Sequence, residues 1–284
     1  MEPQSPNLDK RRGIRRGIYL LPSMFTVGTL VCGYFAIIAT LRGAQYLAVT
    51  AGAGMALIAF DTAAKAIGWA ILFDGFDGRI ARLTNTASAF GREFDSLADV
   101  IAFGVAPAFL AYVWGVRGVD VIAGTQVIQH IRQVAWILTF AYVICGAARL
   151  ARFNIDTVKP AGDRRFFVGM PIPAAAGVVA AIIHFQKQPL ASWEVGAGWL
   201  ALIGILAFLM VSRIRFYSFK SLGLRKRRSY LSIIVIGLIV VGIFLYSEPV
   251  LLVIAFTYAT SGLILRIVSK IRPHPPAPEE VHAA

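Results

Sequence analysis

Four aspartates lie at fixed intervals between residues 74 and 99, in a stretch that continues into long apolar runs on both sides. Asp74 and Asp77 are three residues apart and Asp95 and Asp99 are four apart, so on helices each pair projects from one face. Ionisable side chains at the mouths of membrane helices are costly and usually functional. Because four close carboxylates cannot all stay ionised without compensation, the spacing predicts a site for divalent cations.

The residue types around these aspartates indicate the chemistry. A set of carboxylate oxygens without His or Cys suits Mg²⁺ or Mn²⁺ better than zinc or copper. Such cations neutralise a diphosphate, Arg82 would add fixed donors, and Gly78 and Gly91 would let a nucleotide approach the backbone. A remaining carboxylate could accept a hydroxyl proton. Helix capping and salt bridges would explain one or two of the aspartates, but not four.

The elements that position these residues must bring both aspartate pairs together. The polar run at residues 84–88 and Gly91 predict a turn between the pairs. That turn would pack the second helix beside the first and gather the four carboxylates into one cluster.

The composition predicts an all-α, polytopic membrane protein. Hydrophobic residues make up 57% of the chain and charged residues 15%, and the mean hydropathy is +0.69. Apolar runs of about 20 residues indicate about eight transmembrane helices. They cover residues 20–41, 55–73, 95–115, 133–151, 168–186, 196–212, 230–246 and 249–268. Residues 43–60 fit a loop, a half-span or an early start of the second helix.

Positive charge is distributed asymmetrically between these spans. Most of the 28 Lys and Arg residues fall at the N-terminus, in the aspartate motif and in alternate loops. The positive-inside rule then places both termini and the motif on the cytoplasmic face of the cell membrane. Such a surface attracts anionic lipid headgroups. Nucleic acid is not expected as a partner, because the sequence contains no groove-reading module.

A few further residues have simpler interpretations. Asp61 and Lys65 are four apart, which predicts an ion pair in or near the membrane. Cys32 and Cys145 lack paired spacing and are expected to be small packing residues. Prolines at 171 and 173 predict the entry of a helix.

The motif resembles the signature of CDP-alcohol phosphotransferases, D-x2-D-G-x2-A-R-x8-G-x3-D-x3-D. Its fixed positions are Asp74, Asp77, Gly78, Ala81, Arg82, Gly91, Asp95 and Asp99. The resemblance implies a CDP-linked lipid donor and two Mg²⁺ or Mn²⁺ ions on the four aspartates, with Asp99 as general base. It also implies contacts of Gly78, Ala81, Arg82, Ser88 and Gly91 with the donor, a homodimer, and a six-helix core followed here by two C-terminal helices.

The acceptor alcohol depends on residues outside the motif. Segments 96–108, 148–154, 169–176 and 214–220 are similar to the phosphatidylserine synthase branch of that family. This resemblance implies transfer from CDP-diacylglycerol to L-serine, with Arg149 or Arg152 as candidates to bind the serine carboxylate. Glycerol 3-phosphate, inositol phosphate or choline as acceptor, a cation-coupled transporter and a lipid-binding scaffold remain alternatives.

The expected organisation has four parts. Residues 1–18 form a basic cytoplasmic tail, 19–228 a catalytic transmembrane core, 229–272 an additional helix pair and 273–284 a disordered tail. Pro22-Ser23 departs from the Pro-Asn that is often found in this branch.

Overall fold

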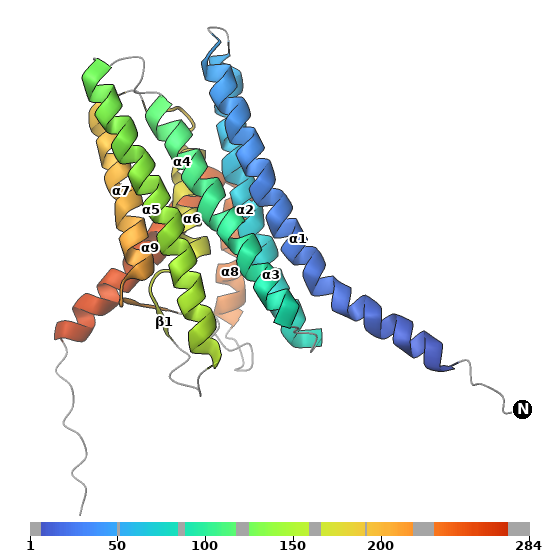
Figure 1. The fold of residues 1–284 in the computed structure, drawn as a ribbon. Coiled ribbons are helices and arrows are strands. Elements are labelled where there is room, and N and C mark those ends of the chain that lie inside the picture. Colours follow the sequence, from blue (N-terminus) through green and yellow to red (C-terminus); the bar gives the residue numbers. More distant parts are fainter. Residues whose placement is uncertain are drawn as a thin grey trace, which may run out of the picture.

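A computed structural model describes residues 7–49, 52–84, 89–117, 125–158, 166–190, 192–217 and 230–271. These residues form a bundle of helices with one small two-stranded sheet (Figure 1). The first helices are α1 (Asn7–Leu47), α2 (Ala53–Thr84) and α3 (Ala89–Asp99), which continues through the π-helix η1 (Val100–Val105) into α4 (Ala106–Arg117). The later helices are α5 (Thr125–Val158), α6 (Ile172–Gln186), α7 (Trp193–Val211), α8 (Tyr230–Leu245) and α9 (Ser247–Ile271).

The predicted fold class is confirmed. Each of the eight predicted spans coincides with a helix, and α3, η1 and α4 together make the third. Five helical stretches within the described residues are long and apolar enough to cross a membrane: Met24–Leu47, Ala53–Ile80, Ala89–Val116, Gln129–Ile155 and Trp193–Val211. The chain is therefore a multi-pass helical membrane protein.

Several predicted boundaries differ from the structure. Helix α1 begins at Asn7, so most of the expected N-terminal tail is helical. The uncertain stretch 43–60 contains the end of α1, a short connection and the start of α2 at Ala53. The fifth span begins at Ile172 and not at residue 168, because Gly169 has a φ of +83° and Pro171 caps α6.

A short antiparallel sheet replaces the start of that span. Strand β1 (Phe166–Val168) pairs with β2 (Arg215–Tyr217), and Phe167 lies opposite Phe216. The Gly169 N–H donates to the Ile214 carbonyl at 2.8 Å, and the Met170 N–H donates to the Leu209 carbonyl at 3.0 Å. The entry to α6 is thereby fixed to the end of α7.

The core is built largely from alanines, with a few large side chains such as Phe60 and Trp114 between the helices. Small residues allow membrane helices to approach closely. Helix α1 packs mainly on α2, α2 also packs on α6, and α5 packs on α7. In Figure 1 the adjoining ends of α2 and α3 and strand β1 lie at one end of the bundle, where the free ends of α1 and α9 extend outward on opposite sides. That end carries the motif.

Candidate metal centre and its surroundings

Three of the four motif aspartates converge where α2 and α3 adjoin. Asp74 comes from the C-terminal part of α2, and Asp95 and Asp99 come from successive turns of α3. One carboxylate oxygen of each lies within 4.8 Å of the others. Asp99 is buried, with 7% of its surface exposed, while Asp74 and Asp95 are partly exposed. The spacing within α3 produces this arrangement because residues four apart share a helix face.

The cluster has the properties of a cation site. Asp99 Oδ1 is buried, and no residue in the described part of the chain donates a hydrogen bond to it. A buried acceptor without a donor is costly, and Asp74 and Asp95 add negative charge beside it. A divalent cation would compensate both, and the all-oxygen ligand set fits a hard cation. The residues present therefore fit the metal that the motif implies.

Asp77 is placed differently from the prediction of one four-carboxylate cluster. It is buried and accepts a hydrogen bond from the Thr26 hydroxyl of α1. Within the described residues, the metal-type group contains the other three aspartates without it. The predicted packing also differs, because α3 lies mainly against α1 and not alongside α2. Asp77 remains close enough to act electrostatically on Asp99.

The polypeptide after Asp99 is unusual, because residues Val100–Val105 form a π-helix. Such segments are rare and are frequent at functional sites. The Tyr142 hydroxyl of α5 donates to the Phe103 carbonyl at 3.2 Å, which fixes the segment to the bundle. On the other side, a Cβ at Gly33 of α1 would lie 2.6 Å from the Ala102 Cα. The backbone that carries Asp99 is thus held between α1 and α5.

Arg149 lies beside the carboxylates. Only 8% of its surface is exposed, and its guanidinium carbon lies 5.4 Å from the centre of the Phe153 ring, one turn further along α5. Its charge lies close enough to Asp99 and Asp74 to act on them electrostatically. Among the described side chains it is the only buried Lys or Arg.

Other predicted residues are more peripheral. Arg152 is exposed on α5. Gly78 is exposed, and a Cβ built there would meet nothing within 4 Å, so space is open above this turn of α2. Gly91 lies within α3 and not in the predicted turn, since α2 ends at Thr84 and α3 starts at Ala89. Ser88 lies outside the described residues, as do the side chains of Ala81 and Arg82, whose backbone belongs to α2.

Two polar residues were not identified from the sequence as partners of the acidic groups. Thr26 donates a hydrogen bond to Asp77, and the buried His184 contacts Asp61. Each partner lies far away in the sequence, so no local spacing indicates these contacts. A polar side chain within an apolar helix is a general indication, and Thr26 and His184 show it. The predicted pair of Asp61 and Lys65 is confirmed, with 2.7 Å between the charged atoms.

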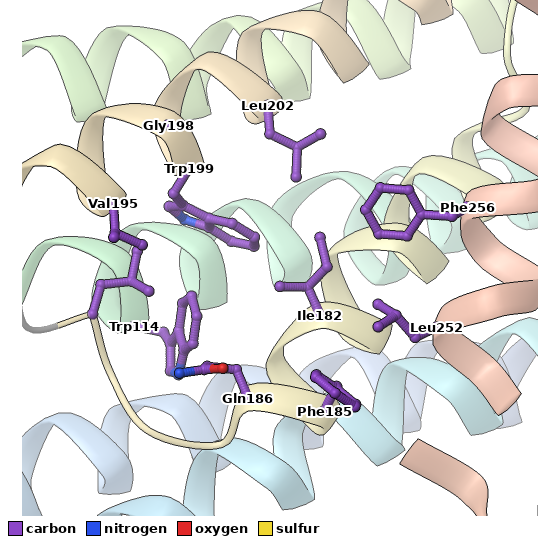
Figure 2. A pocket seen from close by; sticks show the side chains of 11 residues that line it. Trp114, Ile182, Phe185, Gln186, Val195, Gly198, Trp199, Leu202, Leu252 and Phe256 are labelled. Carbon is purple, nitrogen blue, oxygen red and sulfur yellow. The ribbon is translucent and has the colours of Figure 1, made fainter. Parts of the chain in front are cut away.

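A separate hollow of about 480 Å³ lies between α4, α6, α7 and α9 (Figure 2). Trp114, Ile182, Trp199, Leu202, Leu252 and Phe256 are among its lining residues. It is almost entirely apolar and contains none of the motif residues. The hollow is therefore distinct from the carboxylate cluster.

The comparisons with known proteins concern most of this bundle. A family model described as CDP-alcohol phosphatidyltransferase matches residues 19–211. A Helicobacter pylori protein named CDP-diacylglycerol–serine O-phosphatidyltransferase is 36% identical over 225 residues, which are 79% of this chain and 83% of that protein. Proteins of the same name from Bacillus subtilis and Methanocaldococcus jannaschii are each 34% identical. The Bacillus subtilis match covers 70% of this chain and 91% of that protein. The Methanocaldococcus jannaschii match covers 68% of this chain and 79% of that protein.

Proposed function

The chain belongs to the CDP-alcohol phosphatidyltransferase family, and from this premise we infer that it transfers a phosphatidyl group from CDP-diacylglycerol to the hydroxyl of L-serine. The products are phosphatidylserine and CMP. The single observation that best supports this proposal is the convergence of Asp74, Asp95 and Asp99 beside the buried Arg149.

The metal assignment follows from the carboxylates. Asp74, Asp95 and Asp99 would hold the first cation, and Asp77, close by on α2, would contribute to a second. Mg²⁺ or Mn²⁺, when bound, would neutralise the diphosphate and the CMP leaving group. The family resemblance implies two such ions.

The donor site is proposed around the same end of α2. Gly78 leaves open space, so the diphosphate and ribose of the donor can approach the backbone there. Ala81, Arg82, Ser88 and Gly91 are proposed to contact the CDP part on the basis of the family signature. The acyl chains would stay in the membrane while the nucleotide enters from water.

Asp99 is proposed as the general base. It accepts the proton of the serine hydroxyl as that oxygen forms a bond to the phosphorus of the phosphatidyl group. The bond from this phosphorus to the bridging diphosphate oxygen breaks, and that oxygen leaves with CMP. The π-helical segment after Asp99, whose Phe103 carbonyl accepts a hydrogen bond from Tyr142, would help to keep the Asp99 carboxylate in place during this transfer.

Arg149 is the better of the two candidates for binding the serine carboxylate. It is buried beside the carboxylate cluster, whereas Arg152 is exposed. A guanidinium binds a carboxylate through two parallel hydrogen bonds. A single buried arginine among the described residues matches one carboxylate better than the higher charge of a phosphate-bearing acceptor. Arg152 is the second candidate for binding the serine carboxylate.

The orientation is proposed from the charge distribution, with the site and both termini on the cytoplasmic side of the cell membrane. A homodimer, which the family resemblance implies, stays a prediction. Glycerol 3-phosphate, inositol phosphate and choline remain the alternative acceptors to be tested.

The proposal is tested with the purified full chain in detergent or lipid discs. CDP-diacylglycerol, Mn²⁺ or Mg²⁺ and one radiolabelled alcohol at a time are supplied, and CMP release and lipid labelling are measured. We expect both with L-serine. Release with another alcohol but not with serine would overturn the acceptor, and no release with any alcohol would overturn the activity.

A further inference from the structure

The apolar hollow between α4, α6, α7 and α9 lies far along the bundle from the metal ligands. Trp114, one of its lining residues, follows Asp99 by about four turns of the continuous run α3, η1 and α4, which is roughly 20 Å. Gln186 at the end of α6 and Val195 near the start of α7 also line it. The hollow and the carboxylate cluster therefore lie toward opposite ends of the bundle.

Helix α9 bounds the hollow on one side, and contacts elsewhere determine where it lies. At its start, the Ser247 hydroxyl lies 2.9 Å from Nε2 of the buried His184 on α6. Toward its other end, a Cβ at Gly262 would overlap the ring of Phe216 in β2, so helix and strand are in direct contact there. These contacts hold α9 on α6 and β2, and they leave a space between α9 and α7.

The space has the size and lining of a site for an apolar ligand. Its volume of about 480 Å³ lies within the roughly 300–1,000 Å³ of typical ligand pockets. In Figure 2 the side chains of Ile182, Leu202 and Phe256 point toward one another across it. Such side chains offer no hydrogen bonds to water. Because the bundle lies in a membrane, an acyl chain is the apolar group available to fill this space.

Two tryptophans form a fixed wall of the hollow. Trp114 is fully buried and Trp199 is 5% exposed, and their rings pack edge to face with centres 5.1 Å apart. The Trp199 N–H donates to the Ala111 carbonyl at 3.0 Å, and the Trp114 N–H donates to the Lys187 carbonyl at 3.3 Å. Since backbone carbonyls accept both N–H groups, the rings present apolar surface to the hollow.

Opposite charges adjoin the hollow at the end of α6. Lys187 follows the lining residue Gln186 and pairs with Glu248 of α9, and both side chains are 40% exposed. A cation and an anion side by side match the phosphate and the amine of a zwitterionic headgroup, whereas an anionic headgroup would also meet the Glu248 carboxylate. Charged side chains at the ends of membrane helices reach the level of the headgroups.

We propose that the hollow binds one acyl chain of a membrane phospholipid with a zwitterionic headgroup, and that the headgroup lies at Lys187 and Glu248. This lipid fills the space between α7 and α9 and is distinct from the donor at the carboxylate cluster. Its attraction comes from close packing in the hollow and from the charged pair, since an acyl chain leaves one apolar medium for another.

The first test is fluorescence quenching in lipid discs. Trp69, Trp136 and Trp193, each more than half exposed, are replaced by Phe, so that the emission comes from Trp114 and Trp199. Emission in discs of phosphatidylcholine with brominated acyl chains should be at least twofold lower than in discs of the same lipid without bromine.

Gly198→Phe in this background closes the hollow, because Gly198 lines it and a Cβ there would meet nothing within 4 Å. It should remove most of the quenching, and the smaller Gly198→Leu should act in the same direction. Gly237→Phe on α8 is the matched control, since a Cβ at Gly237 also meets nothing and the residue does not line the hollow. Equal quenching with Gly198→Phe and with Gly237→Phe would overturn the proposal.

The second test is mass spectrometry of the intact complex, after the full chain has been incubated in detergent with equal amounts of phosphatidylcholine and phosphatidylglycerol. The unmodified chain should retain one lipid, mainly phosphatidylcholine, and Gly198→Phe should retain none. Glu248→Gln should shift the preference to phosphatidylglycerol, because the charge of Lys187 is then unbalanced. Equal retention of both lipids by the unmodified chain and by Glu248→Gln would overturn the headgroup contact.

The same spectra identify a different occupant. If Gly198→Phe converts a dimer to a monomer and leaves the retained lipid unchanged, a second copy of the chain fills the hollow and the proposal is wrong. Neither quenching nor lipid retention requires turnover, so both results are independent of whether the chain releases CMP with L-serine.

Discussion

The Thr26 hydroxyl of α1 donates a buried hydrogen bond to Asp77 of α2, across 51 residues of sequence. Within the described residues, the other three aspartates of the motif form a group that does not include Asp77. The hydrogen bond from Thr26 also ties the first membrane helix to the helix that carries half of the motif. Near it, Phe25 packs against Phe73 and Phe76, with ring centres 6.4 and 6.3 Å apart.

Thr26→Val tests whether the hydrogen bond from Thr26 keeps the Asp77 carboxylate in an orientation that binds a cation. The change keeps the shape of the side chain but leaves a buried carboxylate without its donor, at a cost of about 1–3 kcal/mol. We expect the Mn²⁺ concentration for half-maximal CMP release to rise severalfold. Thr26→Ser keeps the hydroxyl and serves as the control. An unchanged metal dependence in Thr26→Val would show that Asp77 does not need this donor.

Asp99→Asn tests the general base. An amide cannot take the serine proton, and removal of a general base typically lowers rates by about 10²–10⁴-fold. The rate of CMP release should fall by at least about 10²-fold. The Kd for CDP-diacylglycerol, measured by equilibrium dialysis in detergent, should stay within tenfold of that of the unmodified chain. A near-normal rate would exclude Asp99 as the base.

Removal of divalent cations tests the metal centre independently of turnover. EDTA should abolish CMP release, and Mg²⁺ or Mn²⁺ should restore it. A ligand at 100 times its Kd stabilises the folded state by about 2.7 kcal/mol, so saturating Mn²⁺ should raise the thermal unfolding midpoint of the EDTA-treated chain. The combined Asp74→Ala and Asp95→Ala variant should show no such shift. An equal shift in that variant would place the cation elsewhere.

Gly33→Ala tests the support of the π-helical segment. The added methyl group would lie 2.6 Å from the Ala102 backbone, so one helix must move, at a cost of about 1–3 kcal/mol. We expect a lower thermal midpoint and a lower kcat, because η1 directly follows Asp99. Gly68→Ala is the control, since a Cβ there meets nothing within 4 Å. Equal effects of both substitutions would argue against this close contact.

The ion pair of Lys187 and Glu248 predicts that the stability of the N-terminal end of α9 depends on pH. The hydrogen bond from Lys187 lowers the pKa of Glu248, and the same bond raises the pKa of Lys187. The stabilisation is therefore present above the ordinary pKa of a glutamate and below that of a lysine. It is lost as the pH falls through the lowered pKa of Glu248, or rises through the raised pKa of Lys187.

Hydrogen exchange of α8 and α9 at pH 7 and near pH 3.5 measures this effect, with each rate divided into the intrinsic rate at the same pH to give a protection factor. The protection factors at the start of α9 should fall at the lower pH, and Glu248→Gln should show the lower protection already at pH 7. Both side chains are 40% exposed, so the effect should be local and small. Equal protection factors at both pH values in the unmodified chain would show that the pair does not stabilise the start of α9.

Much of the fold could be predicted because each membrane helix is indicated by a continuous apolar run in the sequence. Runs of about 20 apolar residues identified the helices, although α6 starts late since Gly169 and Pro171 break the run. The residue spacing in α3 correctly placed Asp95 and Asp99 on one face. The spacing of three residues between Asp74 and Asp77 did not reveal that the Thr26 hydroxyl donates to the Asp77 carboxylate, and the role of Asp77 as a metal ligand stays a prediction.

The sequence by itself determined the helical membrane class, the family signature and the aspartates that can hold a cation, because these depend on composition and on short spacings. Only the tertiary structure decided that Asp77 accepts a hydrogen bond from Thr26, and that Arg149 rather than Arg152 is buried beside the cluster. The physical reason is that helix packing joins residues many turns apart. The angle and rotation of each helix depend on all its neighbours, and no local pattern specifies them.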